Sequence, residues 1–225
     1  SGDHHEHWQA GHYASWLGYA WLQQGRFTTA REHLDRVRAN LGRAARRGEQ
    51  PSLLSMRAQY IINSERWTDP VVQWQLEAPG AAFVAQAMDA HATAYAAIKS
   101  GQRARAEQYL ADLVRRGKSP AVADFYSANA SVPAVLERQL RALLLLEDGK
   151  RADGLALLRE AAAMEDAIPV EFGPPDIVKP THELLGEVLL AFGDATQSQR
   201  EFDQALAQAP GRARSLLGLG RAALA

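Results

Sequence analysis

Histidines gather near the start of the chain, where side chains of this type could hold a metal ion. Five of the seven histidines fall within the first 33 residues. His4 and His7 stand three positions apart, a spacing at which two side chains on one helical turn can reach the same ion. The i, i+4 pair of many helical zinc sites is missing, and no acidic third ligand is fixed by the spacing. A metal site at His4 and His7 is therefore an alternative hypothesis.

Glu183 and Glu187 are the second arrangement that could do chemistry, because carboxylates at i and i+4 share one face of a helix. General acid–base catalysis requires two such groups in different environments inside a pocket. Glutamate is rarely buried, so this pair is more typical of a solvated helix face. The chain has no cysteine, no nucleophile-elbow motif and no glycine-rich phosphate loop. We therefore expect neither enzymatic activity nor a cofactor.

The charge balance restricts the partners that the chain could bind. Lys and Arg total 25 and Asp and Glu total 26, which gives a net charge of -1. Nucleic-acid binding requires a basic surface, so we do not expect it here. The apolar runs, such as 142–146, are too short for a membrane-spanning helix, and we expect no membrane insertion. The lack of cysteine suits the cytoplasm and the periplasm equally, and the oligomeric state is left open.

The elements that position these groups are helices joined by turns. The strong helix formers Ala, Leu, Arg, Gln and Glu are abundant, and no stretch alternates with the period of a β-strand. Helix-like runs end at glycines, and prolines lie between the runs or at their starts. The pattern predicts an all-α fold of about ten helices, each of ~12–20 residues.

One helical hairpin recurs in four windows that align on a turn glycine. These glycines are Gly25, Gly101, Gly149 and Gly193. A small residue lies seven positions before each glycine, and another lies five positions after it. The first set is Gly18, Ala94, Ala142 and Gly186, and the second set is Ala30, Ala106, Gly154 and Ser198. Helices cross closely only where side chains are small, so these positions predict where the paired helices cross.

The hairpin fits a helix-turn-helix repeat of about 34 residues, and the stretch 179–212 fits it best. That stretch contains Leu185-Gly186, Leu189, Gly193, Phe202, Ala205 and Pro210, and 11–44 carries Leu17-Gly18, Trp21, Ala30 and Leu34 in the same phase. On these residues the chain resembles the tetratricopeptide repeat family, although His182 stands where the family favours a large apolar residue. The resemblance implies one domain, 1–225, folded as a right-handed α-solenoid of antiparallel helix hairpins. Its repeats would be 11–44, a degenerate 50–86, 87–120, 135–168, 179–212 and a terminal half repeat, 213–225.

In that family the first helix of each hairpin lines a concave groove that holds the ligand, so the phase implies candidate binding residues. The candidates are His12, Ser15, Tyr19, Gln23, His91, Tyr95, Lys99, Gln139, Glu183 and Glu187. For Tyr19 and Tyr95, packing in the core is an equal interpretation. Some members clamp a partner's terminal carboxylate with several Lys, Arg and Asn side chains. Only Lys99 offers such a group here, so we do not expect a full clamp.

The resemblance thus implies a protein- or peptide-binding scaffold that uses its concave face. One alternative is an enzyme, or a protein that binds a small ligand or a metal, built on the histidine-rich first helix. In that case the proline-rich connection 165–180 would act as a lid. Another alternative is a structural oligomerisation segment, because a solenoid leaves an apolar surface open at each end.

Overall fold

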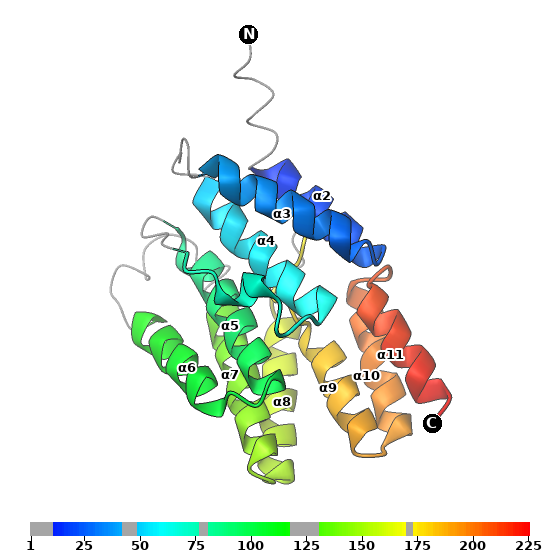
Figure 1. Ribbon diagram of the computed structural model, residues 1–225. Coiled ribbons are helices and arrows are strands. Elements are labelled where there is room, and N and C mark those ends of the chain that lie inside the picture. The colour runs from blue at the N-terminus through cyan, green and yellow to red at the C-terminus, as the bar shows by residue number, and fades with distance from the viewer. Residues whose placement is uncertain (1–10, 42–48, 77–80, 118–130, 170–172) are drawn as a thin grey trace.

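The chain folds into antiparallel helices that stack along a curved path (Figure 1). The computed structural model describes residues 11–41, 49–76, 81–117, 131–169 and 173–225, and within them there is no strand. This architecture confirms the predicted all-α solenoid. The helices are α2 (His12–Gln23), α3 (Phe27–Leu41), α4 (Glu49–Ser64), the 3₁₀-helix η2 (Pro70–Gln73), α5 (Phe83–Lys99), α6 (Arg103–Gly117), α7 (Ser131–Glu147), α8 (Arg151–Asp166), α9 (Thr181–Ala191), α10 (Ala195–Gln208) and α11 (Ala213–Ala223).

The four reference glycines end the first helix of each hairpin in the same way. Their φ angles are 71° at Gly25, 69° at Gly101, 74° at Gly149 and 79° at Gly193. A side chain disfavours this left-handed conformation, which glycine adopts freely. The amide after each glycine donates back to a carbonyl in the last helical turn, as Arg26 does to Trp21 at 2.9 Å. The turns therefore follow from local sequence alone.

Small residues mark the helix crossings, as the spacing predicts. In the hairpin of α9 and α10, the Ser198 hydroxyl donates to the Gly186 carbonyl over 2.8 Å. A Cβ atom added to Gly186 would lie 3.0 Å from Phe202. In the hairpin of α5 and α6, Ala94 and Ala106 are both buried. The close approach of each pair thus depends on the missing or short side chain.

The stack curls until its last helix meets its first helices. The Ala213 amide at the start of α11 donates to the Gln23 side chain on α2 over 3.0 Å. Beside it, the Arg214 side chain donates to the Asn63 carbonyl near the end of α4 over 2.6 and 2.9 Å. The structure therefore closes on itself at one edge, although consecutive helices make most of the packing.

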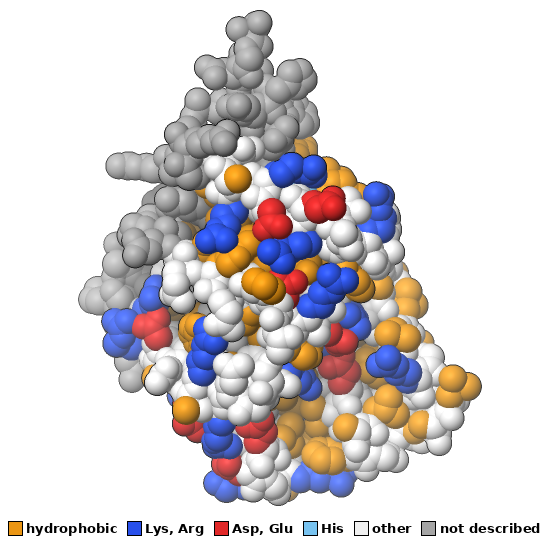
Figure 2. Space-filling view, viewed as in Figure 1, with side chains coloured by type: hydrophobic (Ala, Val, Ile, Leu, Met, Phe, Trp, Pro, Cys, Tyr) orange, Lys and Arg blue, Asp and Glu red, His pale blue; other side chains and the backbone are white. Residues whose placement is uncertain are grey.

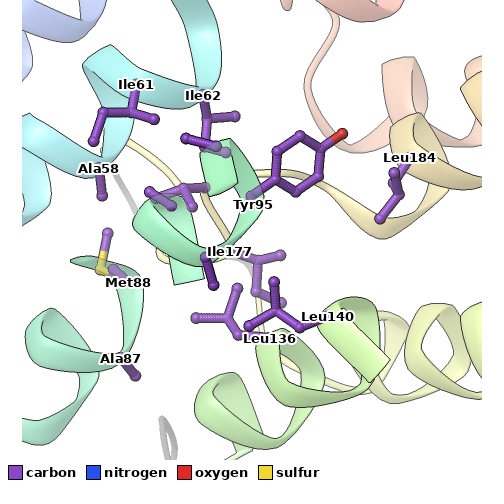
Figure 3. Close-up of a cluster of buried hydrophobic side chains, with 14 of the residues drawn as sticks. Ala58, Ile61, Ile62, Ala87, Met88, Tyr95, Leu136, Leu140, Ile177 and Leu184 are labelled. Atoms are coloured by element: carbon purple, nitrogen blue, oxygen red, sulfur yellow. The ribbon is translucent and has the colours of Figure 1, made fainter. Parts of the chain in front are cut away.

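A continuous apolar core follows the inside of this curve (Figure 3). Ile61 and Ile62 of α4, Tyr95 of α5 and Leu136 of α7 meet there. Ile177, from the connection between α8 and α9, joins the same cluster. Among the described residues, no helix combines the length and the apolar character that crossing a bilayer requires.

Candidate functional site

The structure divides the ten candidate groove residues into a buried group and an accessible group. His91, Tyr95, Gln139 and Glu183 are at most 1% exposed, so in this conformation they offer no surface to a partner. His12 and Lys99 are exposed, and the remaining four are half-buried: Ser15, Tyr19, Gln23 and Glu187. The accessible candidates are therefore those that a partner could contact directly.

The segment 173–180 covers the centre of the concave face. Its carbonyl groups accept hydrogen bonds from helix side chains: Pro175 from Gln59 of α4 over 2.7 Å, and Lys179 from Gln139 of α7 over 2.8 Å. Val178 is fully buried. Extended backbone must find partners for its polar groups when it leaves water, and here the groove residues supply them. The proline-rich connection is thus partly an interior element, whereas its residues 170–172 lie outside the described part of the chain.

A network of buried charges lies where this segment enters α9. The Lys179 ammonium is 2.9 Å from Glu183 and 2.5 Å from Glu187. Arg212 donates to both carboxylate oxygens of Glu183 over 2.6 and 3.0 Å, and the Ser215 hydroxyl donates to the same carboxylate over 2.7 Å. Five groups from α9, α11 and the segment before α9 therefore satisfy one another inside the protein.

The charges in this network stabilise one another against the cost of burial. Burial by itself disfavours the ionised form of each group. The neighbouring cations Lys179 and Arg212 outweigh burial at Glu183 and hold the pKa of its carboxyl well below the usual range. Burial likewise opposes the charged form of Lys179, but Glu183 and Glu187 raise the pKa of its ammonium overall. The network is therefore ionised at neutral pH.

The expectation of a solvated face at Glu183 and Glu187 is wrong for Glu183. Its side chain is completely buried, and the side chain of Glu187 is 31% exposed. The reason is that Lys179 and Arg212 approach from outside α9 and replace water around the carboxylate. The spacing of Lys179, Glu183 and Glu187, four positions apart each time, is a sequence signal for this cluster. Nothing in that spacing identifies Arg212.

A tetratricopeptide repeat family model matches residues 184–225, which cover most of α9 and all of α10 and α11. This part of the chain is therefore similar to a tetratricopeptide repeat. None of the curated proteins matches the chain, and neither does any solved structure.

Two carboxylates hold His182, which lies two positions before the matched residues and stands where the family favours a large apolar residue. Its Nδ1 lies 2.6 Å from Glu201 of α10, and its Nε2 lies 3.1 Å from Asp166 at the end of α8. The hydrogen bond with Glu201, together with the charge of Asp166, raises the pKa of His182 despite partial burial. An ionic bridge between α8, α9 and α10 thus replaces the expected apolar contact.

His91, a groove position in the third repeat, is neutral and completely buried beside the Gln139 side chain. Neither ring nitrogen has a partner within the described chain, and the same holds for the Gln139 side-chain oxygen. Complete burial lowers the pKa of His91 to about 3. His91 is therefore a packed side chain of the core in this conformation.

The concave face is open at one edge, beside the C-terminal ends of α4 and α5. A hollow of about 500 Å³ lies there, lined by Glu65, Arg66, Trp67, Thr68, Asp69, Lys99 and Ser100. The Trp67 ring contacts Tyr95, with centroids 5.4 Å apart, and the Lys99 ammonium lies 5.5 Å from the Tyr95 ring centroid. Trp67 is half-buried: it packs against the apolar core and also lines the hollow.

The charges around this hollow are unequally compensated. Glu65 pairs with Arg214 over 2.7 Å, and Asp69 accepts hydrogen bonds from Tyr60 and the Val71 amide at 2.9 Å each. Glu65 adopts φ 54°, a rare conformation for a side-chain-bearing residue. Lys99 and Arg66 form no ion pair with a described residue. Both cations lie over aromatic rings instead, Lys99 at 5.5 Å from the Tyr95 centroid and Arg66 at 5.8 Å from the Phe27 centroid.

The described residues contain no cluster of three or more His, Asp or Glu side chains that could hold a metal ion. His4 and His7 lie outside the described residues. His12 stacks on Trp16 with centroids 4.6 Å apart, and buried His33 bonds to the Ala14 carbonyl over 3.0 Å. The proposed lid does approach this helix, since a Cβ atom on Gly173 would lie 3.0 Å from Trp16.

Proposed function

We propose that this chain is a protein-interaction scaffold that holds a segment of its partner along the open edge of the concave face. The scaffold role rests on the tetratricopeptide match and on the helical-repeat architecture, since such repeats typically mediate protein interactions. The hollow beside Lys99 supports the choice of this edge. The centre of the concave face is already filled by residues 173–180, so a partner has access only beyond it.

The open edge has the composition of a recognition surface. It combines a half-buried tryptophan, Trp67, with the cations Lys99 and Arg66, which contact aromatic rings and form no ion pair with a described residue. Aromatic rings and arginine dominate the energetics of protein interfaces, because they combine large contact area with directed polar groups. Gln23 on α2 and Glu187 on α9 are further groove positions that stay half-buried.

Site-specific photo-crosslinking tests this assignment. A benzophenone side chain placed at Lys99 should trap a discrete partner from an extract of the source cells. The same group placed at Arg200, which is exposed on the second helix of its hairpin, is the matched control and should not trap that partner. Mass spectrometry of the crosslinked species identifies the partner.

The purified partner then allows a quantitative measurement. Lys99→Glu should weaken binding about two- to fivefold, because an exposed ion pair contributes up to about 1 kcal/mol. The melting temperature should not change, since Lys99 is exposed and has no ion pair among the described residues. Equal trapping from positions 99 and 200, or unchanged affinity of Lys99→Glu, would contradict the assignment.

A further inference from the structure

The strap, as we call residues 173–180, belongs to a connection that is longer than its task requires. Residues 209–212 are enough to join α10 to α11, whereas residues 167–180 join α8 to α9. Both connections lead from the second helix of one hairpin to the first helix of the next. The longer one therefore contains residues that linking the helices does not need, and the strap is the part of it that enters the concave face.

The concave face binds the strap through its main chain. Gln59 of α4 donates to the Pro175 carbonyl over 2.7 Å, and Arg212 donates to the Val178 carbonyl over 3.3 Å. Gln139 of α7 donates to the strap carbonyl nearest α9 over 2.8 Å. Hydrogen bonds to main-chain carbonyls give affinity without depending on the side chains of the bound segment. These donors can therefore hold another segment that has the same backbone shape.

The side chains of the strap occupy an apolar seat. Ile177 is 6% exposed and Val178 is fully buried. Ile177 belongs to the cluster that contains Ile61 of α4, Tyr95 of α5 and Leu136 of α7 (Figure 3). By contrast, the outer face over α3 to α6 carries interspersed Lys, Arg, Asp and Glu side chains (Figure 2). The seat therefore suits two adjacent β-branched apolar side chains and excludes charged ones.

Two prolines prepare the strap for this seat. Pro174 and Pro175 have no backbone N–H that burial would leave unpaired. Each proline also disfavours the helical conformation of the residue before it, so the free segment does not form a helix. A segment that already has its bound conformation loses less conformational entropy when it binds. The strap thus has the properties of a preorganised peptide ligand.

We propose that the strap is an intrachain ligand that occupies a peptide-binding seat at the centre of the concave face. The partner that fits this seat presents a proline followed two positions later by two β-branched residues, as in Pro175, Ile177 and Val178. The strap competes with such a partner at an effective concentration of about 1 mM, because it is tethered. The seat is separate from the hollow beside Lys99, so this inference and the proposed function can fail independently.

A synthetic peptide with the sequence of residues 173–178 tests the seat in the full chain. Ile177→Ser combined with Val178→Ser removes the side chains that seat the strap and leaves the groove helices unchanged. The peptide should bind this variant with a dissociation constant of roughly 100 µM, so that about 1 mM peptide raises its melting temperature by about 3–6 °C. The wild type should gain only about 1 °C, because its own strap weakens the apparent affinity about tenfold.

Two controls establish where the peptide binds. A peptide with serine in place of both β-branched residues should leave the melting temperature of the double variant unchanged. In the same background, Gln59→Ala should weaken peptide binding about fivefold, because it removes the donor to the bound main chain. Gln75→Ala is the matched control, since Gln75 is exposed, and should leave the affinity unchanged.

The outcomes separate an intrachain ligand from a purely structural connection. If the double substitution abolishes cooperative melting, Val178→Ala, a smaller change in the strap, takes its place in the same measurements. The proposal would be overturned if the peptide failed to stabilise the folded variant or stabilised the wild type equally. It would also be overturned if the serine peptide acted as well, or if Gln59→Ala and Gln75→Ala had the same effect.

Discussion

Replacing Glu183 with glutamine removes the negative charge that Lys179 and Arg212 share. All three side chains are at most 3% exposed, and glutamine keeps the shape of the glutamate. The substitution therefore changes the electrostatics of the buried network and leaves its packing nearly intact. Arg212 loses its ionic partner altogether, whereas Lys179 retains Glu187.

The magnitude follows from the cost of a buried charge without a partner. Breaking a buried ion pair from one side costs about 3–5 kcal/mol. Because Lys179 keeps one carboxylate, we expect the lower value, about 3 kcal/mol at neutral pH. For a domain of this size, each kcal/mol shifts the melting temperature by about 2–4 °C, so the expected loss is about 6–12 °C. Glu187→Gln is the control and should cost less than about 1 kcal/mol, since its side chain is 31% exposed.

The difference in free energy of unfolding between the wild type and Glu183→Gln should depend on pH. The pKa of Glu183 is lowered in the folded state, so its contribution is fully present above the ordinary glutamate pKa of about 4.3 and is lost as pH falls below it. The free energies of unfolding of the wild type and of Glu183→Gln, measured in urea, should therefore differ by a constant amount between pH 6 and 8. The difference should shrink progressively below about pH 4. The reasoning would be refuted if the two free energies of unfolding agreed within about 0.5 kcal/mol at pH 7. It would also be refuted if their difference stayed the same below about pH 4.

Three further predictions concern packing and histidine chemistry. Gly218→Val should destabilise the chain by about 1–3 kcal/mol in chemical denaturation, because Phe202 is fully buried and cannot move aside; unchanged stability would show that α10 and α11 pack less closely. The raised pKa of His182 beside Glu201 should appear in an NMR titration. The contribution of His182 to stability should be present below about pH 6.5 and should be lost as the pH rises through the folded-state pKa. An NMR titration that gave His182 the ordinary histidine pKa would contradict the ionic bridge. His91→Leu should raise the free energy of unfolding by roughly 1 kcal/mol, because it removes a buried ring whose nitrogens lack a well-formed hydrogen bond; a marked loss would show that the Gln139 side chain bonds to this ring.

The helices, their turns and their pairing can all be predicted from the residue pattern. Gly25 and Gly193 end their helices in a left-handed conformation that only local chemistry requires. The small residues Gly186 and Ser198 are twelve positions apart, close enough in the chain for one hairpin to bring them together. Each of these features depends on contacts within a single repeat, and a repeat pattern records such contacts directly.

Which groove positions stay accessible to a partner depends on the tertiary structure. Arg212 and Tyr19 are 193 positions apart and meet, over 3.3 Å, only because small rotations between successive repeats accumulate until the stack closes. The same curvature draws residues 173–180 into the concave face and buries Glu183, a glutamate whose sequence context indicated exposure. The summed rotation cannot be predicted from any short segment of the sequence, because it depends on the packing of all the repeats. The buried network and the open edge beside Lys99 are therefore properties of the whole stack.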